Sequence, residues 1–128
     1  MLAAPAWIFH YDTPTRAETW TLRHAEGAAL LVVESDAQPT RRYEGTAIES
    51  DTVKLEVSTG TARLALDCKP AKRALSQKCN DTKAKKLEVL DCFVPDFKEP
   101  MTFGPAPGVE YVEVQGCKGF RLIAGDSK

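Results

Sequence analysis

Histidine is the side chain best suited to acid–base catalysis near neutral pH, and the chain of 128 residues has two, His10 and His24. On the strand that we expect over residues 7–11, His10 projects opposite the aromatic side chains, toward solvent. His24 shares a face with Trp20 and Leu22, where a histidine more often completes a core than acts as a base. We assign no catalytic residue. A small hydrolase that uses His24 with a carboxylate is kept as an alternative.

The sequence motifs of common enzyme classes are missing. The chain has no glycine-rich phosphate loop, no Gly-x-Ser-x-Gly and no His-Glu-x-x-His. Its carboxylates are scattered and mostly lie where strands are expected to end, as turn chemistry alone predicts. The sequence therefore indicates a protein that binds rather than catalyses, without a cofactor.

The cysteine content gives the strongest chemical signal. The four cysteines are separated by 10, 12 and 24 residues, so no pair has the short spacing of a structural zinc site. An even number of cysteines predicts two disulfides and an oxidising compartment. Three connectivities are possible, and we favour Cys68–Cys79 with Cys92–Cys117. No metal site is expected.

The start of the chain fits the same compartment. Its Ala4-Pro5-Ala6 resembles the end of a removed export signal. No apolar run approaches the ~20 residues that a transmembrane helix needs. We expect a periplasmic or extracellular protein, bacterial by its alanine-rich composition.

The basic segment, residues 69–86, holds seven basic residues against one acid, while the whole chain carries −1. Lys69, Lys72 and Arg73 are its candidate binding residues, and an anionic surface is the alternative ligand. Aromatic residues are missing from this segment, so nucleic acid is not an expected partner. Pro70 favours a turn or two of helix inside a closed Cys68–Cys79 loop.

The Pro/Phe segment, residues 93–108, contains four of the eight prolines and three of the five phenylalanines: Phe93, Phe97 and Phe103. Its prolines predict a long loop without regular pairing. The phenylalanines either plug one end of the fold or present an apolar surface to a partner.

The rest of the chain predicts the architecture. Apolar and polar residues alternate over 53–57 and 62–68 on both sides of a turn, which indicates an antiparallel hairpin. Further strands are expected at 7–11, 19–24, 28–34 and 43–49, and a closing hairpin at 109–115 and 120–124. Residues 87–94 fit a strand or a helix.

The chain is therefore expected to form a single domain, residues 1–128, of the mainly-β class. We predict an antiparallel meander that forms a small barrel or sandwich of seven to eight strands, with at most one or two short helices. An α+β fold is the alternative. The expected function is non-enzymatic recognition of a protein partner through residues 93–108, by a monomer.

Overall fold

The computed structural model describes residues 4–13, 16–75, 85–95, 101–106, 108–114 and 117–122. All regular elements in these residues are strands. The described part of the chain therefore contains no helix that could cross a bilayer. The strands are β1 (Trp7–Thr13), β2 (Arg16–Ala25), β3 (Ala28–Ser35), β4 (Arg41–Glu49), β5 (Val53–Thr59), β6 (Ala62–Leu75), β7 (Lys85–Phe93), β8 (Met101–Pro105), β9 (Val109–Val114) and β10 (Cys117–Leu122).

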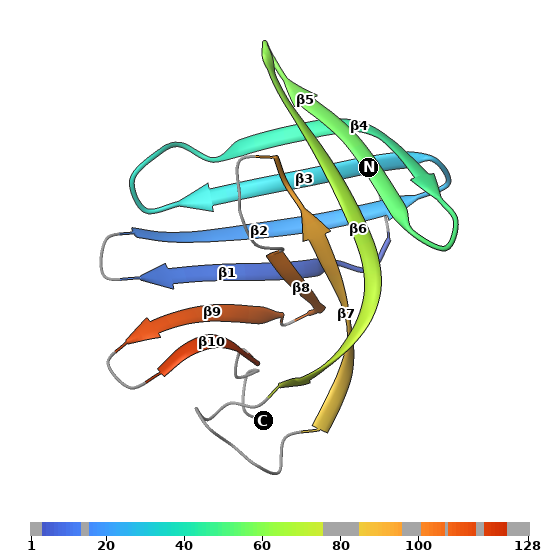
Figure 1. The fold of residues 1–128 in the computed structure, drawn as a ribbon. Coiled ribbons are helices and arrows are strands. Elements are labelled where there is room, and N and C mark those ends of the chain that lie inside the picture. Colours follow the sequence, from blue (N-terminus) through green and yellow to red (C-terminus); the bar gives the residue numbers. More distant parts are fainter. Residues whose placement is uncertain are drawn as a thin grey trace.

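The first eight strands form a closed antiparallel barrel. Each of β1 to β7 pairs with the next strand in sequence, and β8 pairs back onto β1. In Figure 1, β5, β6 and β7 cross in front of the strands β1 to β4. The expectation of a small, mainly-β barrel is confirmed, and the α+β alternative is not needed for any described residue.

The last two strands extend this sheet. Trp7 and Ile8 of β1 pair with β8, while the next four residues of β1 pair with β9 in parallel; β10 then pairs with β9. The chain passes from β8 to β9, the two strands that pair with β1 on this side, through Gly104 and Gly108. A Cβ on Gly104 would lie 2.5 Å from Val109 Cγ2, and Gly108 has a φ of +110°. Larger residues would disrupt this crossover.

Alternating side chains fill the barrel. Phe9, Leu22, Leu31 and Leu55 point inward and are almost fully buried, because successive residues of a strand face opposite sides. The aromatic rings of Phe9 and Phe103 pack at a centroid distance of 5.9 Å. The interior is therefore packed with side chains, as in other small barrels.

The described parts of the basic segment, residues 69–75 and 85–86, are strands and not the turn or two of helix expected after Pro70. β6 continues to Leu75, β7 begins at Lys85, and the two strands pair residue by residue from Asp67 opposite Phe93 to Leu75 opposite Lys85. Each strand satisfies the backbone hydrogen bonds of the other, and this pairing overrides the local helix signal at Pro70. The ambiguous residues 87–94 are accordingly a strand up to Phe93.

The Pro/Phe segment contains a regular strand. Its centre forms β8, which pairs with β7 and β1. The expectation that prolines exclude regular pairing is wrong here because residues 101–104 contain no proline, and Pro105 is the last residue of the strand. Prolines therefore bracket β8 instead of interrupting it.

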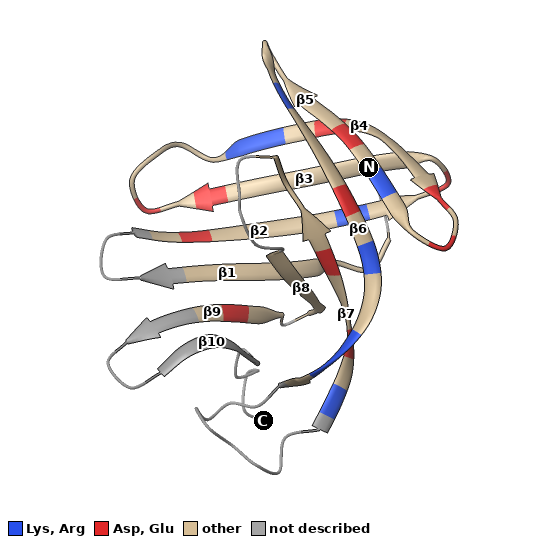
Figure 2. Cartoon of the chain, viewed as in Figure 1, with Lys and Arg blue, Asp and Glu red and all other residues tan. Residues whose placement is uncertain are grey.

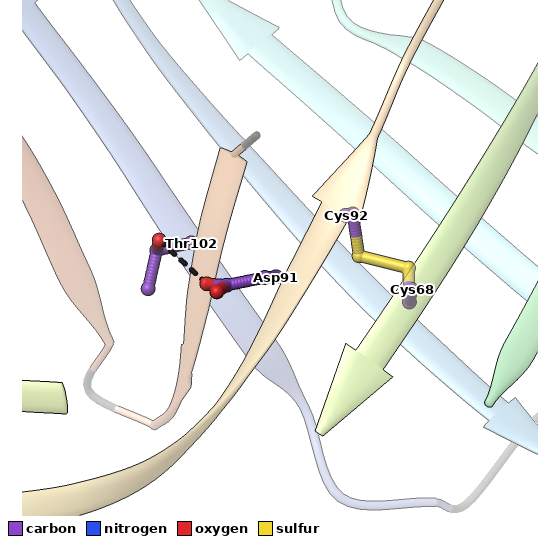
Figure 3. Close-up of a disulfide and its surroundings, with 4 residues drawn as sticks. All are labelled: Cys68, Asp91, Cys92 and Thr102. Atoms are coloured by element: carbon purple, nitrogen blue, oxygen red, sulfur yellow. Dashed lines mark hydrogen bonds between the residues drawn. A yellow bond between two sulfur atoms is a disulfide. The ribbon is translucent and has the colours of Figure 1, made fainter. Parts of the chain in front are cut away.

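The disulfide joins Cys68 to Cys92, which corrects the favoured pairings of both residues. Their Cα atoms lie 3.9 Å apart, because the two cysteines are directly opposite on β6 and β7. Figure 3 shows the bond between the strands. After Cys68 the extended chain runs on for seven residues of β6, about 23 Å, away from that point. Cys79 and the side chain of Cys117 lie outside the described residues.

Candidate functional site

Four outward-facing residues form a continuous line across the barrel wall. Ile48 of β4 is opposite Lys54 of β5, Lys54 is opposite Asp67 of β6, and Asp67 is opposite Phe93 of β7. Residues that are directly opposite in antiparallel strands project from the same face of the sheet. We call Ile48, Lys54, Asp67 and Phe93 the outer row.

The two ends of the outer row are apolar and accessible. Ile48 is 69% exposed and Phe93 is 46% exposed, and these are the large hydrophobic side chains that stand out from the described surface. Lys54 and Asp67, both exposed, lie between them with opposite charges. Exposed apolar side chains beside charged ones make the outer row a candidate recognition surface.

A groove runs beside Phe93. It has a volume of about 430 Å³ and opens between β5, β6 and the end of β7. The small side chain of Ala65 lies in it, and the Nζ atom of Lys69 lies 5.9 Å from the centre of the Phe93 ring. The groove lining is Lys54, Leu55, Glu56, Ala65, Leu66, Asp67, Phe93, Val94 and Pro95. This shape can receive a side chain from another molecule.

The three candidate phenylalanines do not act together. Phe103 is fully buried in the barrel, whereas Phe93 is exposed on the wall. Phe97 lies outside the described residues. Of the two alternatives that the sequence left open for these phenylalanines, burial inside the fold applies to Phe103 and exposure at the surface applies to Phe93.

The three candidate basic residues also divide. Lys69 and Lys72 are exposed, and Lys72 is directly opposite Glu88. Arg73 donates two hydrogen bonds to Asp91, at 3.0 and 2.8 Å, and these bonds raise the pKa of its guanidinium. Figure 2 shows basic residues along the part of the β6–β7 ribbon that runs toward β10 and acidic residues among them.

Asp91 is the centre of a polar tie on the outer side of β7. Besides the guanidinium of Arg73, it accepts a hydrogen bond of 2.9 Å from the hydroxyl of Thr102, as Figure 3 shows. The Thr102 side chain is completely buried. Buried polar groups need such partners. Arg73 therefore has a structural role, and the two N–H donors that bind Asp91 are not available to a ligand.

His24 contacts an acid, as the hydrolase alternative requires. Its Nδ1 atom is hydrogen-bonded to Glu49, which also accepts a bond of 3.2 Å from the backbone N–H of Gly27. These two hydrogen bonds, chiefly that with His24, lower the pKa of Glu49. Glu49 thereby ties the β2–β3 turn to the end of β4. His10 instead contacts the hydroxyl of Thr19, at 2.7 Å.

Sequence reasoning did not select Ile48, although a signal was present. Apolar residues at Tyr43 and Ala47 point into the barrel, which places Ile48 on the polar face beside Thr46. An isoleucine at this position breaks the alternation of apolar inward and polar outward residues along the strand. Within the described part of the chain, His, Cys, Asp and Glu side chains form no cluster of three or more that could hold a metal ion.

Comparisons of the chain with protein-family models, with curated proteins and with solved structures give no match. The functional argument therefore depends on the residues of this chain alone.

Proposed function

We propose that this protein is a non-enzymatic binding domain that recognises a protein partner through the outer row. The observation that carries the proposal is the exposure of Phe93, at 46%, at the end of a strand where it pairs with Asp67. A displayed aromatic side chain on a fixed backbone loses little conformational entropy on binding, and such residues often dominate the energy of protein interfaces.

The surroundings of Phe93 support a protein rather than a small ligand. Charged side chains surround the ring and its groove, among them Lys54, Glu56 and Asp67, and they carry both signs. Protein interfaces have this arrangement of an apolar centre and a polar rim. The sequence-based hypothesis and the proposed surface have Phe93 in common. The other residues of the proposed surface lie on the barrel wall and outside the Pro/Phe segment.

An oxidising compartment fits the same proposal. The Cys68–Cys92 disulfide lies fully buried in the barrel, where a folded chain would retain it. Disulfides persist in the periplasm and outside cells. We infer that the protein works in one of those places.

The alternative of an anionic surface bound by the basic segment has less support. Arg73 is engaged by Asp91, and Glu88 is opposite Lys72. Binding of this kind would weaken steeply as salt is added, because exposed charges are screened. An affinity for anionic vesicles that falls with salt would favour it over the outer row.

The test compares two variants of the tagged protein in its source cell, with chemical crosslinking before purification. Phe93→Ala should remove the crosslinked protein complex that the wild type forms. Lys72→Ala is the matched control on the same β6–β7 hairpin and should leave the complex intact. The proposal is wrong if Phe93→Ala retains the complex, or if Lys72→Ala alone removes it.

A further inference from the structure

We propose that the protein partner of the outer row is a second copy of this chain, an inference that rests on the proposed function. The outer row has the order apolar, basic, acidic, apolar from β4 to β7. Reversed, the order is apolar, acidic, basic, apolar. Such a row is complementary to its own reverse, which is the requirement for a two-fold symmetric interface.

The geometry follows from a two-fold axis that is parallel to the strands and passes between β5 and β6. Neighbouring strands lie about 4.8 Å apart, so the axis is equally far from Lys54 and Asp67. Rotation about it brings Lys54 of each copy opposite Asp67 of the other. The same rotation brings Ile48 of each copy opposite Phe93 of the other. In this arrangement the two ion pairs lie next to the axis, and the two apolar pairs lie outside them.

The groove beside Phe93 gives the incoming isoleucine a place to bind. Ala65, which lies in this groove, projects from the same face as Asp67, two residues away on β6. Because Ala65 is small, the surface is hollow between Phe93 and β5. An isoleucine side chain opposite Phe93 would bury its exposed methyl groups there, which favours association.

The adjacent line of residues is compatible with the same symmetry. Thr46, Glu56 and Ala65 are directly opposite one another on β4, β5 and β6. The rotation places Glu56 of each copy opposite Ala65 of the other, so these acidic groups do not meet. The proposed dimer differs from the sequence-based expectation of a monomer.

The experiment is sedimentation equilibrium of the full chain over micromolar concentrations, with charge-reversed variants. Lys54→Asp and Asp67→Lys should each be monomeric, because every cross-copy pair then has like charges. An equimolar mixture of the two should form a dimer, because every mixed pair has opposite charges. The double variant Lys54→Asp/Asp67→Lys should dimerise again. Ile48→Ser should weaken the wild-type dimer at least about tenfold.

All four positions are on the surface, so circular dichroism of each variant should match the wild type. The inference is overturned if the wild type stays monomeric, or if the mixture of charge variants does not associate. If a Phe93-dependent crosslink to a different protein persists in either case, the proposed function stands without this inference. If the wild type dimerises but Phe93→Ala dimerises equally well, this inference is wrong, and the proposed function is wrong as well only if Phe93→Ala also retains the crosslinked complex.

Discussion

Phe93 and Phe103 lie ten residues apart in the same Pro/Phe segment, yet one is 46% exposed and the other is fully buried. Phe93 ends β7 on its outward face. Phe103 lies on the inward face of β8, against Phe9. The exposure of Phe93 follows from strand parity, since Cys92 and Val94, on either side of it, are both buried. The strand β8 is instead buried on both faces, because Thr102 beside Phe103 is also fully buried.

The comparison of Phe93 with Phe103 separates two roles, packing of the core and contact with a partner, that the sequence places in one segment. Inward residues of β6, β7 and β8 hold the barrel together, whereas the residues of the outer row contribute little to the core and remain available for contact. Substitutions on the two faces should therefore change different properties: the free energy of unfolding on one face and association on the other.

Phe103→Ala should have the largest effect on stability. It removes a fully buried ring and leaves a cavity next to Phe9, which should cost about 3–5 kcal/mol of unfolding free energy. Urea unfolding followed by circular dichroism measures this loss. A change below about 1 kcal/mol would show that the interior collapses around the site, and the contrast with Phe93 would disappear.

Removing the disulfide should have the next largest effect. The double variant Cys68→Ala/Cys92→Ala opens a link between residues 24 positions apart in sequence, and we expect a loss of about 2–4 kcal/mol. Non-reducing peptide mapping of the wild type should recover the Cys68–Cys92 pair. Recovery of a Cys68–Cys79 peptide instead would contradict the register of β6 and β7.

The polar tie on the outer side of β7 should contribute less. Asp91→Ala leaves the buried hydroxyl of Thr102 and the guanidinium of Arg73 without this acceptor, which should cost about 1–3 kcal/mol. Asp91→Asn is the matched control, because its amide oxygen can still accept one of these hydrogen bonds. Equal losses for both variants would mean that the charge, not the hydrogen bonding, stabilises the tie.

Acid should weaken the fold slightly through Glu49. Its pKa is lower in the folded state, so its contribution is complete above the ordinary value of about 4.3 and is lost as the pH falls through the folded value. The urea midpoint of Glu49→Gln should therefore fall less steeply than that of the wild type in this acidic range. Parallel pH profiles would show that the contact with His24 does not bias folding.

Much of the barrel can be predicted from the sequence because alternation over short strands is a local signal. The hairpin of β5 and β6 and the strands at the N-terminus follow directly from it. The long pairing of β6 with β7 could not be predicted in this way, because the register depends on contacts between residues 67 and 93 that are distant in the chain. The disulfide assignment failed for the same reason.

The candidate site could be predicted only in part. Phe93 and Lys69 were selected from composition, and the structure brings them together. Ile48 and the opposite charges beside it were missed, because the outer row exists only once four strands are aligned. The sequence places Phe103 in the same loop as Phe93, because β8 is only five residues long and the prolines around it indicate a loop.

The free energy of unfolding of Phe93→Ala tests the central claim most directly. We expect a loss of about 1 kcal/mol or less, because the ring is nearly half exposed and its contact with Lys69 is worth about 0.5–1 kcal/mol at most on a surface. A loss comparable with that of Phe103→Ala, about 3 kcal/mol or more, would place Phe93 in the core and contradict a binding role for the outer row.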